Sequence, residues 1–302
     1  MQQSDFGIQT SEFMNVAFLG LGNLGRAIAK RIKLFFGKDM NLFVWSRNRT
    51  KVELFVSETS AVPLKDLSDI PKDVEFVLIC LFDSDAVASV IDKIDVSGKI
   101  LVDLTTNHPK RTPEFYNTVA NRGGSYLESP VLGSVIPAME GRLTVLVAGE
   151  EKAYLKVQSI LSAIASKIFF FGNNIPNASK MKLVNNLVLG GFMAVLAEAL
   201  AVGEKLGLSK DTLIDVLSHG AGRSAILDAK RSKLVNKDFS PHFSVALIRK
   251  DLDYLIDYAF ASDEKKFLAQ SIYSVYDRAK QFGLSQLDFS SVYLMFEKIL
   301  KE

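Results

Sequence analysis

The sequence predicts an α/β protein, in which a doubly wound parallel sheet is followed by an all-α domain built on a long central helix. Up to residue 171, short apolar segments alternate with stretches of helical spacing, which is the pattern of a parallel sheet covered by helices on both faces. After residue 206 every periodic segment has helical spacing only. A long apolar segment, Asn177–Leu206, joins the two parts. At 302 residues the chain can form two domains, and we expect them at 14–176 and 177–302.

Composition excludes several classes of protein. The chain is 48% hydrophobic and 23% charged, with a net charge of +2, so we expect an ordinary globular protein without the basic surface that a nucleic-acid partner requires. Cys80 is the only cysteine and three histidines are widely spread, so neither a disulfide nor a metal site is expected. Residues 1–13 are polar and resemble no signal peptide, which predicts a cytoplasmic location.

The first apolar strand, Asn15–Leu19, leads into the sequence GLGNLG and then into a helix over Arg26–Phe36. A GxGxxG motif between a strand and a helix is typical of dinucleotide binding on a Rossmann-type sheet. The first glycine allows the tight turn, the second lets the backbone approach a pyrophosphate, and the third lets helix and strand pack closely. The alternative is a turn that is merely rich in glycine. We predict that the whole motif contacts a cofactor: Gly20, Leu21, Gly22, Asn23, Leu24 and Gly25.

The second strand, Asn41–Trp45, ends in Ser46, Arg47, Asn48 and Arg49. NAD-binding proteins place an acidic residue here to bind the ribose 2′-hydroxyl, and this chain has none. Because an arginine can bind a 2′-phosphate through two hydrogen bonds, Ser46, Arg47 and Asn48 predict NADP as the cofactor, with NAD as the alternative. The arginines could instead be solvated surface residues.

Two further buried strands, Val74–Leu81 and Lys99–Leu104, flank a helical stretch at Ser84–Ile94. Ligands of doubly wound sheets bind beyond the carboxyl ends of the strands. This rule places Leu81, Phe82 and the Thr105–Asn107 turn, including Thr106, at the cofactor edge. The threonines could also cap a helix over 109–119.

A strand at Ser125–Glu128 precedes Leu132, Gly133 and Ser134, which form a loop before the next helical turn. Such a loop can present backbone N–H groups to a carboxylate, although an ordinary tight connection is an equal alternative. The strands Leu143–Ala148 and Lys167–Phe171, with a short helix from Glu151 between them, complete the first domain. Five helices are then expected after the central one, at 209–218, 224–235, 245–261, 265–280 and 290–300.

The central helix, for which Asn177 or Ser179 is the expected N-cap, is apolar on every side, which predicts a buried helix. A membrane span is the alternative, but the uncharged run Leu183–Ala197 has about 15 residues, fewer than the roughly 20 that a bilayer requires. Lys182 and Asn186 lie one turn apart on one face. Because a lysine is seldom buried without a partner or a function, we interpret this face as a working site, against the alternative of a lysine that reaches to solvent.

Together these residues resemble the β-hydroxyacid dehydrogenase family, which includes 3-hydroxyisobutyrate dehydrogenases and glyoxylate/succinic semialdehyde reductases. Five segments match the family's motifs in order: GLGNLG at 20–25, DLTTNHP at 103–109, ESPVLGSVIPAMEGRL at 128–143, KLVNN at 182–186 and RKDLDYLIDYA at 249–259. The ESPVLGS spelling and the Ser-Arg pair after the second strand are most similar to the NADPH-using glyoxylate/succinic semialdehyde branch.

The resemblance implies a role for each matching residue. Lys182 takes the catalytic position and Asn186 lies beside it on the substrate. Thr106 and Lys250 lie against the cofactor, and the backbone of Leu132, Gly133 and Ser134 binds the substrate carboxylate. The family usually has Ser in place of Leu132, and often has glycines where Asn173, Pro176 and Ala178 stand; the first departure concerns the identity of the substrate rather than the chemistry.

The implied reaction is reversible hydride transfer between NADP and a small hydroxy acid, semialdehyde or 2-oxo acid, with Lys182 as the acid or base and no metal. The implied substrate bears a carboxylate, and neither nucleic acid nor a membrane is expected as a partner. The central helix has more hydrophobic surface than one small domain needs, and members of the family are commonly dimers or tetramers, so we expect a homodimer or homotetramer. Two alternatives remain. An imine reductase on the same scaffold usually lacks the lysine, and a protein that binds NADP without catalysis has no need of Lys182, Asn186 and Lys250.

Overall fold

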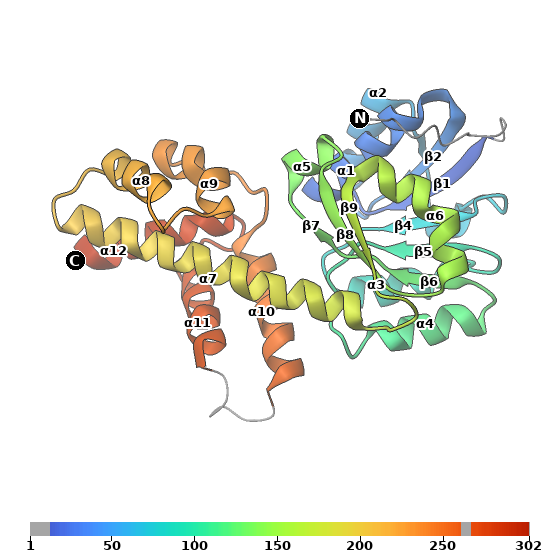
Figure 1. Ribbon diagram of the computed structural model, residues 1–302. Helices are drawn as coiled ribbons and strands as arrows, with labels where there is room; N and C mark the ends of the chain where they lie inside the picture. The colour runs from blue at the N-terminus through green and yellow to red at the C-terminus, as the bar shows by residue number, and fades with distance from the viewer. Residues whose placement is uncertain (1–12, 261–266, 302) are drawn as a thin grey trace, which may run out of the picture.

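The computed structural model describes residues 13–260 and 267–301. Its first half contains a six-stranded parallel sheet in the order β3-β2-β1-β4-β5-β6 (Figure 1). The sheet and its helices comprise β1 (Met14–Leu19), α1 (Asn23–Phe36), β2 (Met40–Trp45), α2 (Arg49–Thr59), β3 (Val62–Pro63), β4 (Phe76–Ile79), α3 (Ser84–Ile91), β5 (Ile100–Asp103), α4 (Thr112–Asn121) and β6 (Ser125–Glu128). The doubly wound parallel sheet is confirmed.

Alternate residues of β1 enter two different cores, as the two-residue period of a strand requires. Val16 and Phe18 pack on the face that α1, α2 and α6 cover. Ala17 and Leu19 pack on the opposite face against α3 and α4. Because both faces of the strand are buried from residue 16 on, the sequence of residues 16–19 is continuously apolar. This arrangement leaves the carboxyl ends of the strands as the edge at which side chains can meet a ligand.

A second, three-stranded sheet in the order β7-β8-β9 follows. Its elements are β7 (Val131–Leu132), α5 (Val135–Met139), β8 (Leu143–Val147), α6 (Glu151–Ile164) and β9 (Ala165–Phe170). The two-residue strands β3 and β7 were not predicted, because such short strands give no periodic signal. Helix α2 was not predicted either; it buries only Val52 and Phe55, so its sequence shows little apolar periodicity. The helix from Glu151 is also longer than expected, with 14 residues.

In the second half every regular element of the described residues is a helix, and these helices pack around α7 (Asn177–Lys205), a single long helix that extends away from the first half (Figure 1). The remaining helices are α8 (Lys210–His219), α9 (Ala225–Asn236), α10 (Val245–Ala259), α11 (Phe267–Gln281) and α12 (Val292–Lys301). All five predicted helices are present, although the predicted start of α11 at Lys265 and the predicted end of α10 at Ala261 lie outside the described residues.

The prediction that α7 is buried on every side is wrong for the single chain. Residues on one face, such as Met193, Ala197 and Leu200, are fully buried, because they belong to the core that α7 forms with the other helices of this half. The opposite face leaves apolar side chains exposed, including Val188 at 50% and Val195 at 68%. By length and composition α7 could cross a membrane, but 56% of its most apolar stretch is buried in the protein, as in the core helix of a globular fold.

Candidate active site

The glycine-rich turn lies between β1 and α1, and each of its glycines is required for a different structural reason. Gly20 has φ +114°, and a Cβ there would lie 2.2 Å from the carbonyl oxygen of Cys80. A Cβ on Gly25 would lie 2.1 Å from the carbonyl oxygen of Gly20. Around Gly22, by contrast, no atom of the described chain lies within 4 Å of that position. The first and third glycines thus allow close packing, and the second keeps open the space that a pyrophosphate requires.

Helix α1 begins at Asn23, three residues earlier than predicted, so the motif itself supplies its first turn. The N–H groups at a helix start have no partner within the helix and attract anions. Gly20 N donates to Trp45 O at 2.8 Å, and Cys80 N donates to Leu19 O at 2.9 Å. These bonds place the end of β2, the glycine-rich turn and the end of β4 side by side along one edge of the sheet.

At the end of β2 the two arginines differ in their contacts. Arg49 donates to Leu64 O at 2.7 Å, and Asn48 is the N-cap of α2, where its side chain accepts from Lys51 N. Arg47 is exposed and makes no hydrogen bond or ion pair with any described residue, while Ser46 beside it is buried. Of the two arginines, only Arg47 therefore has its whole guanidinium free of contacts with described residues, which favours it as the partner of a 2′-phosphate.

The turn after β5 is held by the buried carboxylate of Asp103. That carboxylate accepts hydrogen bonds from Thr105 N at 2.9 Å, Asn107 Nδ2 at 2.7 Å and Tyr126 OH at 2.8 Å. Burial raises the pKa of Asp103 to about 6. Thr105 in turn accepts from Leu81 N at 3.0 Å, which ties the end of β4 to the same turn. The threonines do not cap the next helix, since the N-cap of α4 is Arg111.

Lys182 and Asn186 both lie on the buried face of α7, as their spacing predicts. Lys182 is 7% exposed and Asn186 is fully buried. The Lys182 ammonium has no hydrogen-bond acceptor among the described residues, and its nearest aromatic contact is the Phe243 ring, 6.0 Å from Nζ to the centroid. Burial lowers the pKa of Lys182 to about 8; Asp251 opposes the shift and Lys250 adds to it. An amine of this kind can donate or accept a proton near neutral pH.

A chain of polar contacts connects α7 to the cofactor edge. Asn186 Nδ2 donates to Asp251 Oδ2 at 2.6 Å, and Lys250 Nζ lies 2.7 Å from Asp251 Oδ1. Lys250 also donates to Thr106 O at 2.9 Å. The structure therefore brings together Asn186, Lys250 and Thr106, residues that are far apart in sequence. Asp251, which joins them, was missed by the sequence analysis, although it directly follows Lys250 in the motif at 249–259.

The N-terminus of α7 is capped from outside the helix, so the predicted caps are wrong. Its N-cap residue is Pro176, which makes no side-chain cap. Instead Glu128, at the end of β6, accepts hydrogen bonds from Ala178 N at 2.9 Å, Ser179 N at 3.3 Å and the Ser179 hydroxyl at 2.6 Å. A carboxylate at this position also complements the positive end of the helix dipole. Burial raises the pKa of Glu128 to about 7, against these hydrogen bonds.

The predicted substrate loop connects β7 to α5. Gly133 has φ +113°, and a Cβ there would lie 2.7 Å from Leu143 Cδ2, so glycine is required at this turn. Ser134 is the N-cap residue of α5 and makes no side-chain cap. Leu132 packs against a small cluster formed by Leu146, Ala148 and Ala178. Because Ala178 is one turn before Lys182, this contact joins the loop to the end of α7 that carries the lysine.

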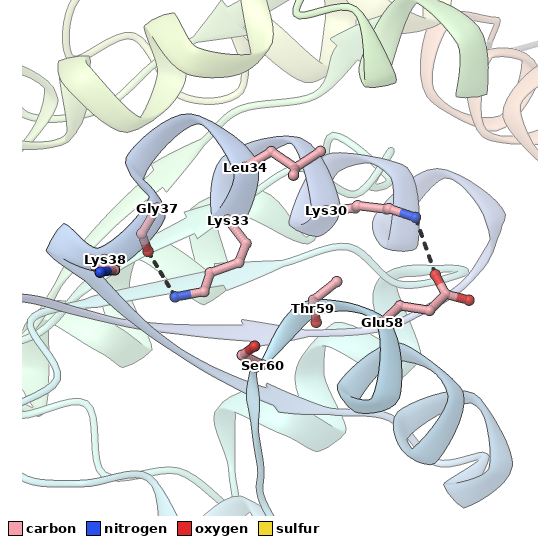
Figure 2. A pocket seen from close by; sticks show the side chains of 8 residues that line it. All are labelled: Lys30, Lys33, Leu34, Gly37, Lys38, Glu58, Thr59 and Ser60. Carbon is pink, nitrogen blue, oxygen red and sulfur yellow. Dashed lines mark hydrogen bonds and ion pairs between the residues drawn. The ribbon is translucent and has the colours of Figure 1, made fainter.

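A surface hollow of about 370 Å³ lies at the far end of α1 from the glycine-rich turn (Figure 2). Two of its three lysines are already engaged, since Lys30 pairs with Glu58 and Lys33 donates to the carbonyl oxygens of Gly37 and Met40. None of the predicted site residues lines it. Among the residues that the structure describes, no group of His, Cys, Asp and Glu side chains could hold a metal ion.

Comparison with known families agrees with this geometry. Residues 15–172 match the NAD binding domain of 6-phosphogluconate dehydrogenase, and residues 177–296 match the NAD-binding domain of NADP-dependent 3-hydroxyisobutyrate dehydrogenase. These are two-domain dehydrogenases that use a nicotinamide cofactor. The chain belongs to the β-hydroxyacid dehydrogenase family, and its cofactor is NADP.

Individual proteins of known name are also similar. The glyoxylate/succinic semialdehyde reductase 1 of Arabidopsis thaliana is 28% identical over 92% of this chain and 97% of its own length. The human cytokine-like nuclear factor N-PAC is 32% identical over 92% of this chain, which spans about half the length of N-PAC. A solved structure of Psf3 in complex with NADP+ and 2-OPP superposes with a TM-score of 0.85 at 25% identity, covering 93% of this chain and 99% of that one.

Proposed function

We propose that this protein is an NADP-dependent oxidoreductase that interconverts a small carboxylate-bearing carbonyl compound and its alcohol, with Lys182 as the proton donor and acceptor. The substrate would be a semialdehyde or 2-oxo acid of the 3-hydroxyisobutyrate, glyoxylate or succinic semialdehyde type. The observation that carries the proposal is the largely buried Lys182 side chain, 7% exposed, on the same helix face as Asn186. Its ammonium has no hydrogen-bond acceptor among the described residues. A purely structural lysine at this depth would be paired.

The residues at the sheet edge fit the cofactor. The open space at Gly22 and the unpaired N–H groups that begin α1 suit a pyrophosphate, and the unengaged Arg47 suits a 2′-phosphate. We assign the neighbouring contacts to Leu81, Phe82, Thr106 and Lys250. When bound, the reduced nicotinamide supplies a hydride to the carbonyl carbon of the substrate.

Lys182 then has a defined task. As the substrate carbonyl becomes an alkoxide, its oxygen gains negative charge and takes a proton from the Lys182 ammonium; in the reverse direction the neutral amine removes the hydroxyl proton. Asn186 Nδ2 gives one hydrogen bond to Asp251, and Asn186 Oδ1 accepts from Asn185 Nδ2 at 3.1 Å. Its second amide N–H can donate to a substrate oxygen and orient the substrate without adding charge. The backbone of Leu132, Gly133 and Ser134 binds the carboxylate. General acid–base catalysis of this kind contributes roughly 10²- to 10⁴-fold to the rate.

The direct test is oxidation of NADPH and of NADH, followed by absorbance, with glyoxylate, succinic semialdehyde, methylmalonate semialdehyde and tartronate semialdehyde. We expect turnover with at least one of them and a preference for NADPH. Lys182→Ala should abolish most of the turnover and leave NADPH affinity within about twofold; equal losses of both would mean that the lysine only binds. Reduction of a cyclic imine but of none of the carbonyls would favour an imine reductase. NADPH binding without any turnover would favour a non-catalytic protein.

We also propose that α7 pairs with a second copy of the chain, giving a homodimer or a homotetramer. Exposed apolar side chains recur every three or four residues along it from Met181 through Val184, Val188 and Phe192 to Val195, and Val202 follows two turns later. They form a stripe about 30 Å long, with the spacing at which two helices pack side by side. Light scattering should show an oligomer that Val188→Glu/Val195→Glu dissociates. Val216→Glu, at an equally exposed valine on α8, is the control.

Two further predictions stay proposals. The division into units 14–176 and 177–302 is supported by the two family matches, which end at residue 172 and begin at residue 177. A cytoplasmic location is proposed from the sequence alone, and imaging of the tagged full chain would test it.

A further inference from the structure

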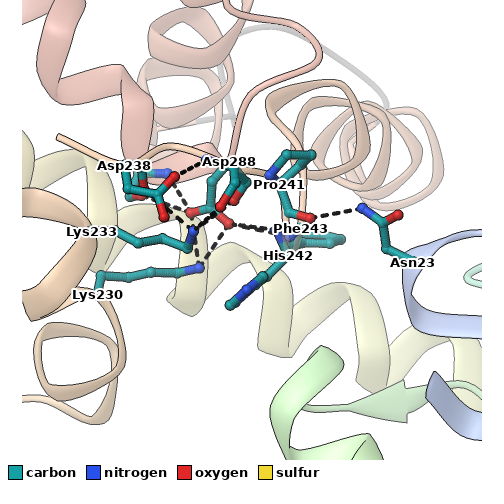
Figure 3. A network of polar contacts seen from close by, with 10 residues as sticks. Asn23, Lys230, Lys233, Asp238, Pro241, His242, Phe243 and Asp288 are labelled. Atoms are coloured by element: carbon teal, nitrogen blue, oxygen red, sulfur yellow. Dashed lines mark hydrogen bonds and ion pairs between the residues drawn. The ribbon is translucent and has the colours of Figure 1, made fainter. Parts of the chain in front are cut away.

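The connection between α9 and α10, residues 237–244, reaches from the helical half to the glycine-rich turn; we name it the strap. The Asn23 side chain, at the first position of α1, donates to the carbonyl oxygen of Pro241 at 2.8 Å (Figure 3). Two residues further on, the Phe243 ring lies beside the Lys182 ammonium. One short segment therefore contacts both the predicted pyrophosphate site and the proposed catalytic amine.

The strap is held from behind by a buried ion pair. The Asp288 carboxylate, fully buried, accepts from the backbone N–H groups of His242 at 3.1 Å and Phe243 at 3.3 Å. It pairs with Lys230 Nζ at 2.9 Å, on the inner face of α9, and the Ser290 hydroxyl donates to it at 2.7 Å. Figure 3 shows these groups converging on the strap from α9 and from the segment before α12.

A second lysine of α9 holds the start of the strap. Lys233, 7% exposed, donates to Ser240 O at 2.7 Å and to Asp238 O at 3.3 Å. Two backbone hydrogen bonds also hold the strap: Asp288 N donates to Phe239 O at 2.9 Å, and Phe289 N donates to Phe243 O at 2.8 Å. The strap has no helix or strand of its own, so these contacts determine where Pro241 and Phe243 lie.

A buried ion pair gains little stability over apolar residues of the same size, and it is better explained where it fixes one conformation. Here it fixes the backbone N–H groups of His242 and Phe243 in the strap. We propose that Lys230 and Asp288 are positioning residues: they hold the strap so that Pro241 bonds Asn23 and retains the bound dinucleotide, and so that Phe243 stands beside Lys182. The role of Phe243 beside Lys182 rests on the proposed function, whereas the retention of the dinucleotide rests only on NADP binding.

The contact with Asn23 is tested first, because Asn23 is exposed and its change does not threaten the fold. NADPH bound to Asn23→Ala is chased with excess NADP+ and its fluorescence followed by stopped flow. We expect release about 3- to 10-fold faster, as the loss of one hydrogen bond implies. Asn236→Ala, which changes an exposed asparagine at the end of α9, is the matched control. A release rate equal to that of the wild type would overturn the role of this contact.

The ion pair is tested by Asp288→Asn in the full chain, with hydrogen exchange of residues 237–244 and NADPH release as readouts. We expect faster exchange in the strap and release at least as fast as in Asn23→Ala. Because the ion pair acts through the Pro241–Asn23 contact, adding Asn23→Ala to Asp288→Asn should produce little further increase. If the release rate of the double variant rose by the product of the two single effects, the ion pair would act independently of the Pro241–Asn23 contact. Its role would then be merely structural, which would overturn the proposal.

If Asp288→Asn does not fold, Ser290→Ala replaces it, since it removes one hydrogen bond to Asp288 and keeps the ion pair. It should raise the release rate about 2- to 5-fold, again without adding to Asn23→Ala; an unchanged rate would count against the proposal. None of these readouts requires turnover. If the protein is inactive on every carbonyl but shows these effects on release, the proposed chemistry is refuted and the role of the strap is not. If the protein is active but release is unchanged in the variants, the role of the strap is refuted and the proposed chemistry is not.

Discussion

Two buried lysines of the helical half show that the same type of residue can have a catalytic role at one position and a structural role at another. Lys182 on α7 and Lys230 on α9 are 7% and 4% exposed. Lys230 lies against the Asp288 carboxylate, with one oxygen at 2.8 Å and the other at 2.9 Å. Lys182 has no such partner among the described residues. Burial lowers the pKa of both, but Asp288 opposes the shift at Lys230 through direct contact. A paired lysine fixes structure, and an unpaired one remains available to a substrate.

The same contrast recurs at the end of β2. Arg49 is bonded to Leu64 O, which ties α2 to the chain that follows β3, whereas Arg47, two residues earlier, is bonded to no described residue. Contacts thus separate residues of one type into those that hold the protein and those that can hold a ligand. The four predictions that follow test this contrast with substitutions at Lys182 and Lys230, and at Arg47 and Arg49.

The largest expected effect is the loss of turnover in Lys182→Met. Methionine keeps most of the side-chain volume but cannot transfer a proton, so kcat should fall roughly 10²- to 10⁴-fold, with the NADPH dissociation constant changed by less than about twofold. Steady-state assays and fluorescence titration measure the two quantities. Lys205→Met, at the exposed end of the same helix, is the control. A turnover close to that of the wild type would remove Lys182 from the chemistry.

Lys230→Met should instead destabilise the fold. It leaves the buried Asp288 carboxylate without its counter-charge, and breaking one side of a buried ion pair costs about 3–5 kcal/mol of unfolding free energy. Urea denaturation of the two methionine variants makes the comparison direct. We expect Lys182→Met to be as stable as the wild type or more stable, because it removes an unpaired buried charge. Similar losses in both variants would end the distinction between the two lysines.

The pH dependence should follow the lowered pKa of Lys182, about 8. Carbonyl reduction needs the ammonium, so its rate should be constant below pH 8 and fall about tenfold per pH unit above it; alcohol oxidation needs the neutral amine and should show the opposite dependence. Folding lowers this pKa from its ordinary value of 10.5, so the unfolded chain binds more protons between pH 8 and 10.5 and stability should rise with pH in that window. Lys182→Met should lack both features.

Features that depend on residues close together in the sequence could be predicted, and features that depend on distant residues could not. The strand–GLGNLG–helix order and the spacing of Lys182 and Asn186 act over a few residues, and both appear in the structure as predicted. The cap of α7 comes from Glu128, about 50 residues earlier in the chain, so Asn177 and Ser179 were wrong although each is a good capping residue by type.

Long-range contacts explain the other omissions. The role of Asp251 depends on Asn186, and that of Asp288 on a strap 45 residues before it; neither carboxylate stands out by spacing. The sequence indicated more apolar surface on the central helix than one small domain needs, but not which face stays exposed. Apolar residues on every side of a helix do not reveal how many neighbours cover it.

The smallest expected effect concerns the two arginines, which the sequence alone could not tell apart. Arg47→Ala should weaken NADPH binding about tenfold through the loss of charged hydrogen bonds to the 2′-phosphate, and it should leave NADH binding unchanged because NADH lacks that phosphate. Arg49→Ala should instead lower the unfolding free energy by about 1 kcal/mol, since it removes one hydrogen bond to Leu64 O, with little effect on the ratio of the two affinities. Titrating both variants with both cofactors decides the assignment: a loss of NADPH preference in Arg49→Ala alone would exchange the roles of the two residues.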